Sequence, residues 1–267
     1  MRFCVLGGGS KGNATYVEAG RTRLLIDAGF SGKEIERRLA EIGVEAASLS
    51  AILITHEHID HIRGAAVLSR RYRLPLFANP ATFRAAGREL SKPAASHEFE
   101  TGVSFIFGDF QLHPFSVSHD AADPVGFLLK AGGRMLGHCT DTGVVSRLIR
   151  HRLAGCHGLV LECNHDLEML KNGPYPPALQ QRIRSQNGHL ANREAVDLLR
   201  ELLHEGLRHV VLSHISETNN SAAIVEATVR RLQETVAAAM PPLPLPRISL
   251  ADQERVGCLL NLADHDD

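Results

Sequence analysis

The segment ILITHEHIDHIRG, residues 52–64, constrains the fold of this chain more than any other. A short apolar run leads into three histidines, a glutamate and an aspartate within six positions. In an extended segment, side chains two residues apart point the same way, so His56 and His58 can aim at one point. Asp60 and His61, where a turn starts the next helix, can aim at a second point. Imidazole and carboxylate groups are ordinary zinc ligands, so the spacing predicts a metal site rather than a solvated loop.

Composition limits the kind of protein that carries this segment. The chain has 267 residues, 44% of them hydrophobic, and we expect residues 1–267 to form a single α/β domain. A net charge of -1 gives no whole-chain basic footprint of a nucleic-acid binder, although local basic patches are compatible with it. The five cysteines are scattered without a C-x-x-C pair, which favours a reducing cytoplasm over a disulfide framework. No apolar run reaches the roughly eighteen residues of a membrane helix, so we expect a soluble cytoplasmic protein without a membrane partner.

Short strand-like apolar runs alternate with fewer amphipathic segments. The expected strands are 2–6, 14–19, 22–29, 51–55, 75–79, 103–107, 110–117, 125–131, 134–141, 158–164 and 209–214. The expected helices are 32–42, 62–72, 80–90, 144–152, 193–205 and 222–238. Strands at hairpin spacing favour packed sheets with helices outside over a pure βαβ winding. We expect the proline-rich residues 241–247 to cross the surface to a last strand near 256–260.

A glycine motif near the start imitates a dinucleotide-binding fingerprint. Gly7, Gly9 and Gly12 have the G-x-G-x-x-G spacing, and Asp27 follows at the expected distance. That fingerprint needs a helix to begin at the glycines, whereas the β-type run ATYVEAG follows here. We therefore expect a glycine-rich turn between two strands rather than a nicotinamide site. The turn residues that can meet a substrate phosphate are Ser10, Lys11 and Asn13.

Further ligand-type residues occur where other apolar strands stop. His119 ends FSVSHD, Asp141 ends GHCTD and His214 ends VVLSH. Ligands at strand ends are held by rigid elements, so these residues complete a candidate two-metal set with the histidine segment. Cys139 lies two residues before Asp141 and shares its face by alternation, so a cysteine ligand there is an alternative.

These motifs occur in the order found in the metallo-β-lactamase superfamily. GGGSKGNATYVE, together with NHD and GHLAN, resembles its YycJ-like branch, and the resemblance covers roughly residues 1–220. It implies a four-layer αββα sandwich with metals in a cleft at one edge of the two sheets. It implies one metal held by His56, His58 and His119, another held by Asp60, His61 and His214, and Asp141 as the bridge. Asp27 is expected to be a buried carboxylate that orients or supports the ligands.

The expected ligand set narrows the range of reactions that the site can catalyse. Two metals about 3.5–4 Å apart can hold a hydroxide between them and stabilise an in-line displacement. A bridging aspartate resembles the phosphodiesterase and glyoxalase II branches. NGHLANREA resembles the GHST element of the ribonuclease Z branch, which implies that His189, paired with Glu162, assists the leaving group. The alternative is that His189 merely caps the helix that begins near Ala191.

The favoured hypothesis is a dinuclear phosphodiesterase or nuclease with Asp60, His189 and Glu162 as catalytic residues. The resemblance implies exonuclease action on DNA, with 5′ to 3′ polarity as one option. We expect two divalent ions, zinc first and manganese or iron as alternatives, and a nucleic-acid substrate. Asn164 and His165 are expected near the substrate or the ligands, and two arginine groups are candidate phosphate tracks: Arg70, Arg71 and Arg73, and Arg147, Arg150 and Arg152. The rivals are hydrolysis of a small cyclic phosphodiester or thioester, and a metal-binding module without turnover. The sequence does not indicate an oligomeric state.

Overall fold

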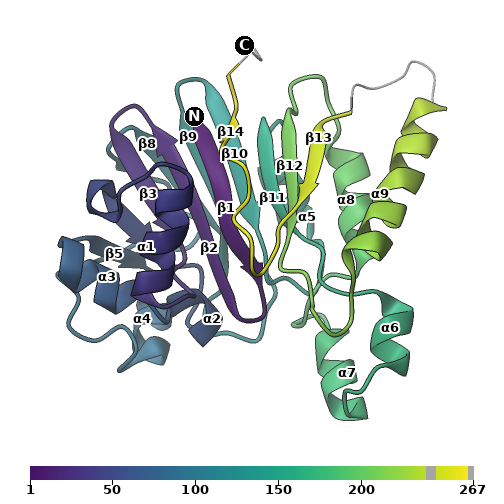
Figure 1. The fold of residues 1–267 in the computed structure, drawn as a ribbon, viewed down its shortest axis with the longest axis horizontal. Coiled ribbons are helices and arrows are strands. Elements are labelled where there is room, and N and C mark those ends of the chain that lie inside the picture. The colour runs from purple at the N-terminus through teal and green to yellow at the C-terminus, as the bar shows by residue number, and fades with distance from the viewer. Residues whose placement is uncertain (239–244, 264–267) are drawn as a thin grey trace.

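The computed structural model describes residues 1–238 and 245–263 and contains two seven-stranded sheets (Figure 1). The first sheet runs β14 (Leu260–Asn261), β1 (Arg2–Gly9), β2 (Gly12–Ala19), β3 (Thr22–Ile26), β4 (Ala51–Leu53), β5 (Pro75–Ala78), β6 (Ala95–Glu98). The second runs β13 (Arg247–Leu250), β12 (His209–Ser213), β11 (Gly158–Glu162), β10 (Arg134–Cys139), β9 (Val125–Ala131), β8 (Phe110–Ser116), β7 (Phe105–Phe107). In each sheet an antiparallel half joins a parallel half.

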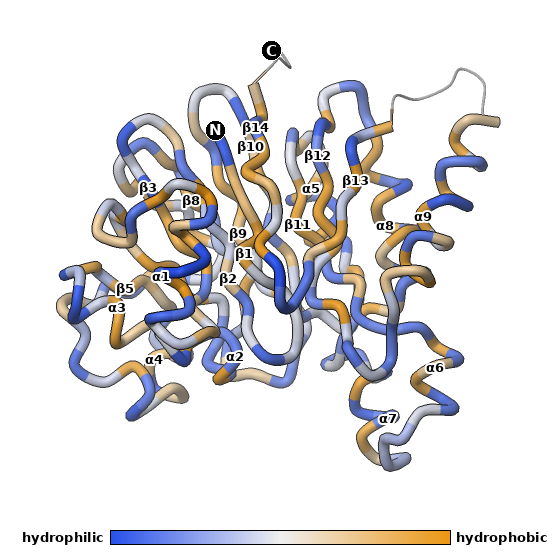
Figure 2. Tube along the Cα trace, viewed as in Figure 1, coloured by the Kyte–Doolittle hydropathy of each residue, from blue (hydrophilic) through white to orange (hydrophobic). Residues whose placement is uncertain are grey.

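Apolar side chains from both sheets form the central core between them. Phe3 and Leu24 of the first sheet cluster there with Phe127 and Val160 of the second, and all four are buried. Orange, hydrophobic stretches follow the strands in Figure 2, whereas the connecting segments are largely blue. Burying apolar surface of this kind is the main favourable contribution to folding. The two sheets therefore pack face to face as the inner layers.

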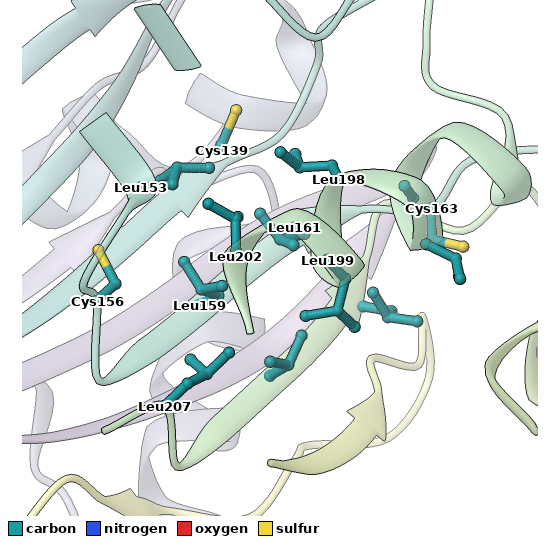
Figure 3. Packing of buried hydrophobic residues seen from close by; sticks show 14 of the residues in the cluster. Cys139, Leu153, Cys156, Leu159, Leu161, Cys163, Leu198, Leu199, Leu202 and Leu207 are labelled. Atoms are coloured by element: carbon teal, nitrogen blue, oxygen red, sulfur yellow. The ribbon is translucent and has the colours of Figure 1, made fainter. Parts of the chain in front are cut away.

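Helices cover the outer face of each sheet. Buried residues of α1 (Gly32–Glu41), α3 (Ala65–Tyr72) and α4 (Pro80–Ala86) pack with the outer side chains of the first sheet. Those of α5 (Arg147–Leu153), α8 (Asn192–Leu202) and α9 (Ala222–Ala237) pack on the second sheet (Figure 3). This is the four-layer αββα sandwich that the motifs implied. No helix in residues 1–238 and 245–263 is long and apolar enough to cross a bilayer.

Most elements expected from hydrophobic patterns are present, with short shifts at their ends. The helix expected at 62–72 is divided into α2 (Ile59–Ile62) and α3. The glycine-rich turn is a β1–β2 hairpin, and no helix follows it, so the dinucleotide-binding alternative is wrong. The strand expected near 256–260 is the short β14, and residues 241–244 of the proline-rich segment lie outside the described residues.

Five elements of the described residues had no counterpart among the expected ones, and one of them is the short 3-10 helix η1 (Ala46–Ser48). Edge strands β6 and β13 lack a run of buried residues, so alternation does not reveal them. The short helices α6 (Leu167–Asn172) and α7 (Pro177–Ile183) project beyond one edge of the sheets (Figure 1). α7 has no buried residue, and therefore no core-facing apolar stripe marks it in the sequence.

Candidate metal centre

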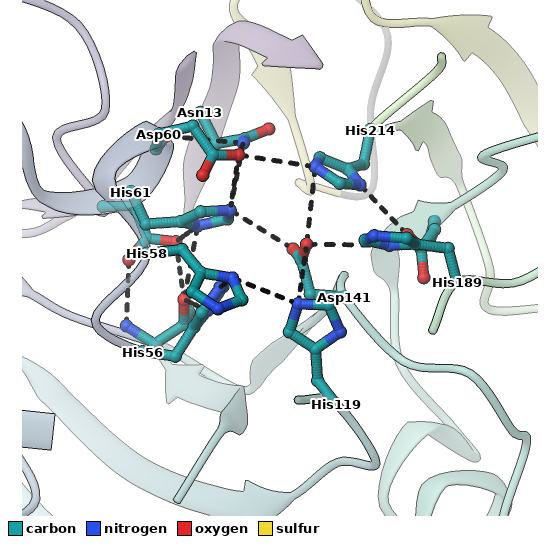
Figure 4. Close-up of polar contacts among 12 residues, drawn as sticks. Asn13, His56, His58, Asp60, His61, His119, Asp141, His189 and His214 are labelled. Carbon is teal, nitrogen blue, oxygen red and sulfur yellow. Dashed lines mark hydrogen bonds and ion pairs between the residues drawn. The ribbon is translucent and has the colours of Figure 1, made fainter. Parts of the chain in front are cut away.

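Ligand-type side chains from both sheets meet at one edge of the sandwich (Figure 4). The histidine segment follows β4 and continues into α2, which belongs to the first sheet's side. His119 follows β8, Asp141 follows β10, and His214 follows β12 in the second sheet. The face-to-face packing of the sheets thus brings together residues that are far apart in the sequence.

One group of donors consists of three imidazoles. The donor nitrogens of His56, His58 and His119 lie within 4.8 Å of one another. His56 Nε2 is 3.1 Å from His58 Nδ1, and His119 Nε2 is 3.3 Å from the same nitrogen. This convergence has the geometry of a three-histidine cation site.

A second group contains Asp60, His61 and His214, whose donor atoms also lie within 4.8 Å. His61 Nε2 is 3.4 Å from Asp60 Oδ2, and His214 Nε2 is 3.7 Å from that oxygen. Asp141 lies between the two groups: its Oδ2 is 3.5 Å from His61 Nε2, and its Oδ1 is 3.4 Å from His214 Nε2 and 3.9 Å from His119 Nε2. The site therefore has the donor set and the arrangement of a divalent metal site.

The backbone at this edge adopts a conformation that L-residues rarely take. Asp27, Asp141 and His214 have φ values of 62°, 55° and 54°. Left-handed backbone at non-glycine residues costs free energy and concentrates at functional sites. Here it turns each of these residues out of the line of its strand.

Buried hydrogen bonds orient the imidazoles. His61 Nδ1 donates to Asp27 Oδ2 at 2.8 Å, which directs His61 Nε2 toward Asp60 and Asp141. Thr55 Oγ1 also donates to Asp27, at 2.9 Å, and lies 3.0 Å from His56 Nδ1. Such outer hydrogen bonds select the tautomer that presents the other ring nitrogen to a metal. Asp27 has the supporting position expected of it.

The two buried carboxylates of the second sheet have different partners. Glu162 Oε2 accepts the amides of Thr142 and Leu190 at 2.9 and 3.3 Å, and its Oε1 lies 2.7 Å from His189 Nδ1 and 3.0 Å from His214 Nδ1. Asp141 Oδ2 and His214 Nε2 are buried and have no hydrogen-bond partner among the described residues. Buried polar atoms of this kind call for a ligand, because leaving them unpaired costs free energy. The donors thus fit bound metal ions, with Glu162 in an orienting position.

The imidazoles and carboxylates of the cluster shift one another's pKa values. Burial disfavours protonation of His214, but the carboxylates of Asp141, Asp60 and Glu162 together outweigh it and raise the pKa of His214 to about 10. Burial disfavours the Glu162 carboxylate, yet attraction to His189 and the hydrogen bond between them lower its pKa to about 2. The pKa of Asp141 also falls well below its usual value, since the surrounding histidines, His214 and His61 foremost, together outweigh its burial. The carboxylates therefore stay ionised, as cation binding requires.

The cleft over this cluster has a volume of about 230 Å³ and contains only some of the expected substrate residues. Ser10 and Asn164 line it, and Asn13 lies against the cluster with its amide 3.2 Å from Asp60 Oδ2. Lys11 does not line it, because its ammonium pairs with Glu217 at 2.9 Å. His165 lines a separate pocket beside α8 and α9.

Several alternatives left open by the sequence are resolved by side-chain positions. Cys139 packs in the core on the helix side of the second sheet, near Leu153 and Leu161 (Figure 3), and joins no donor group in the described part of the chain. His189 does not cap α8: the Ala191 amide donates to Glu194, while His189 contacts Glu162. The two arginine groups lie on the outer helices α3 and α5 or beside them, and none of their residues lines the cleft.

Residues of α7 and its flanks form a cleft wall that sequence reasoning missed. Tyr175, Leu179, Arg182 and Ile183 line it, and Asp120 and Ser216 lie at other points of the rim. The available signal was the segment NGPYPPA, residues 172–178, in which prolines flank one of only three tyrosines in the chain.

The chain belongs to the metallo-β-lactamase superfamily, because the model of the β-lactamase superfamily domain matches its residues 22–215. It is 37% identical over 236 residues to the exodeoxyribonuclease YycJ of Bacillus anthracis, covering 88% of this chain and 89% of that protein. It is 39% identical over 233 residues to the exodeoxyribonuclease WalJ of Streptococcus pneumoniae serotype 2, covering 86% and 87%. The metallo-β-lactamase fold protein YhfI from Bacillus subtilis shares the fold, with a TM-score of 0.73 at 16% identity, over 97% of this chain and 99% of that one. The superfamily and the YycJ-like branch expected from the motifs are thereby confirmed.

Proposed function

We propose that this chain is a metal-dependent phosphodiesterase that acts as an exonuclease on DNA. The observation that carries the proposal is the convergence of two donor groups around Asp141 in one cleft. Two relatives that each cover more than four-fifths of the chain are named exodeoxyribonucleases, which supports DNA as the substrate. A nucleic-acid substrate also agrees with a site built to stabilise charge on a transferring phosphoryl group.

The proposed ligands divide into two sets that share one carboxylate. His56, His58 and His119 would hold one divalent ion, Asp60, His61 and His214 would hold a second, and Asp141 would be shared by the two. Zinc suits this set of nitrogen and oxygen donors best, with manganese and iron as the other candidates. When bound, such ions activate water as a nucleophile and neutralise charge on phosphate oxygens.

His189 is the proposed general acid. Its Nδ1 lies 2.7 Å from Glu162 Oε1, so its Nε2 is the nitrogen left to serve the cleft that His189 lines. The Glu162 carboxylate accepts from Nδ1 and orients the ring, so that Nε2 can give a proton to the departing alkoxide oxygen. Glu162 also contacts His214 at 3.0 Å, so the same carboxylate supports a proposed metal ligand.

The remaining proposed residues contact the substrate or shape the cleft. Ser10 and Asn164 line it and offer polar groups to the sugar or the phosphate. Asn13 supports the ligands instead, because its amide contacts Asp60 and His61. Asp60 combines a ligand role with direct exposure to the cleft.

A substrate panel with an Asp141→Asn variant tests this function. We expect the wild type to release nucleotides from the ends of single- or double-stranded DNA, and the variant to lose this activity because the shared ligand is weakened. The matched control is Asp197→Asn, which changes a half-exposed aspartate of α8 and should leave activity unchanged.

The same panel separates the rivals. It includes RNA of the same sequence, a small cyclic phosphodiester and a thioester. Hydrolysis of only the small esters would replace the nuclease by the small-molecule hydrolase. Metal binding without hydrolysis of any substrate in the panel would favour the metal-binding module without turnover.

A further inference from the structure

The α7 segment forms one wall of the proposed catalytic cleft without contributing to the core. None of the α7 residues is buried, and the segment projects beyond the sheet edge (Figure 1). Tyr175, Leu179 and Ile183 line the cleft and are half-buried. Leu179 and Ile183 are four residues apart in α7 and therefore follow one another along one face of the helix. Tyr175 precedes the N-cap Pro176 and extends the same wall of the cleft. This apolar stripe thus faces the place where a substrate binds.

The segment is held in a fixed position relative to the proposed metal ligands. Arg182 forms an ion pair with Asp120, the residue after His119. His119 Nδ1 donates to the Gly188 carbonyl at 3.0 Å, from the turn that follows α7. These contacts join the apolar wall to the loop that carries a proposed metal ligand. These contacts therefore fix the wall relative to the loop of His119.

The local sequence also restricts the backbone of this cleft wall. Tyr175 lies between Pro174 and Pro176, whose rings fix their own backbone φ angles and restrict the residue before each of them. The Gln180 side chain donates to the Tyr175 carbonyl at 2.9 Å. Because the backbone at Tyr175 is restricted in this way, less conformational freedom is lost when a ligand packs on its side chain.

Other residues that line the same cleft are polar. Ser10 from the β1–β2 hairpin and Ser216 after β12 line it together with His58, Asp60 and Asp141 of the donor cluster. A nucleotide has matching chemistry, with a flat apolar face on its base and oxygens on its sugar and phosphate. We propose that Tyr175, Leu179 and Ile183 form a shelf on which the nucleobase beside the scissile phosphate stacks. This proposal rests on the nuclease function proposed above.

Stacking on a shelf of this kind depends on a π face and tolerates any base. We therefore expect cleavage to need a base at the reacting nucleotide and to show little preference among the four bases. An end nucleotide without a base would retain the phosphate contacts but lose the stacking. Its kcat/KM should fall by on the order of tenfold or more.

The test uses two labelled oligonucleotides that differ only in whether the nucleotide at the degraded end carries its base or is abasic. Wild type should prefer the normal end, and Tyr175→Ala should cut both at the wild-type abasic rate. Tyr175→Phe keeps the ring and should retain the preference. Gln181→Ala, an exposed change on the same helix that does not line the cleft, should behave as wild type.

Equal cleavage of normal and abasic ends by the wild type would overturn the shelf and leave the nuclease function standing, and so would an unchanged preference in Tyr175→Ala. If the wild type cleaves no polynucleotide, the proposed function fails, and calorimetry with the wild-type holoprotein decides the shelf separately. Tighter binding of deoxyadenosine monophosphate than of deoxyribose 5-phosphate would support it, and equal affinity would refute it.

Discussion

At the scale of single residues, the buried carboxylates that orient histidines differ in their contacts from the carboxylate that is proposed to bind metal. Asp27 and Glu162 are buried, and each accepts hydrogen bonds from a backbone amide and contacts an imidazole Nδ1. Asp141 has a buried oxygen without a hydrogen-bond partner among the described residues. The difference in partners, rather than the kind of side chain, distinguishes an orienting carboxylate from a proposed ligand.

The role of His189 gives a prediction at this scale. His189→Ala should lower kcat on DNA by about 10²- to 10⁴-fold, because the alkoxide then leaves without a positioned acid. Activity on bis-p-nitrophenyl phosphate should fall much less, since p-nitrophenolate needs no proton to depart. Metal content, measured by mass spectrometry, should be unchanged.

Glu162→Gln is the informative comparison, because Glu162 contacts both His189 and His214. It should lower activity on both substrates and also weaken metal binding. A ring nitrogen of His189 also lies within 4.8 Å of donor atoms of Asp141, Glu162 and His214, so these four residues form a further candidate donor group. Loss of metal in His189→Ala, or equal losses on both substrates, would therefore contradict the general-acid role and favour a ligand role.

Individual residues show what a sequence can and cannot reveal about such a site. His56, His58, Asp60 and His61 fall within six positions between the end of β4 and the end of α2, so their convergence is predictable from local spacing, although the strand itself ends at Leu53. The lysine of the glycine-rich turn is not predictable in the same way, since the pairing of Lys11 with Glu217 joins residues from distant elements. His165 follows Asn164 directly, yet the two side chains line different pockets.

At the scale of elements, α2 is positioned by a close backbone approach. A Cβ atom on Gly29 would lie 1.6 Å from the Asp60 carbonyl oxygen and 2.6 Å from the Asn13 nitrogen. The Ala28 amide donates to the His61 carbonyl at 2.7 Å, which ties the same segment to α2. The absence of a side chain at Gly29 therefore allows the proposed ligands of α2 to reach the cluster.

Gly29→Ala should consequently displace α2. We expect metal affinity to fall on the order of tenfold or more, as for other changes that disturb ligand orientation. The melting temperature should also fall, because the neighbouring atoms belong to the backbone and cannot rotate away. Competition with a chelator and thermal unfolding measure the two effects.

Gly32→Ala is the control for this change. Gly32 begins α1, and the nearest atom to a Cβ there is Val67 Cγ1, a side-chain atom, at 3.2 Å. The Gly32→Ala variant should keep the metal affinity and the melting temperature of the wild type, since alanine has a higher helix propensity than glycine. Normal metal binding by Gly29→Ala would show that α2 does not depend on this contact.

Elements with a clear periodicity of hydrophobic residues were predictable from the sequence. Elements defined by contacts between distant parts of the chain were not. The buried strands and the larger amphipathic helices were expected close to their observed bounds. Edge strands β6 and β13 depend on a neighbouring strand for their definition, and α7 lacks a buried face. The apolar wall of the cleft was therefore invisible to periodicity.

At the scale of the whole molecule, the site exists because the two sheets pack face to face. The first sheet contributes the histidine segment, and the second contributes His119, Asp141 and His214 from separate strand ends. Residue patterns alone predicted sheets with helices outside, and the order of the motifs indicated the sandwich. The pairing of strands across the molecule required the structure.

The central claim is that this edge binds two divalent ions that hydrolysis requires. The most direct measurement is the metal content of the purified protein by mass spectrometry, with DNA cleavage assayed on the same sample. His58→Ala is compared with His151→Ala, which changes an exposed histidine of α5. We predict about two metal ions per chain in wild type and His151→Ala, and loss of both metal and cleavage in His58→Ala. A wild type that cleaves DNA without bound divalent metal, or a His58→Ala protein that retains full metal and activity, would contradict the account.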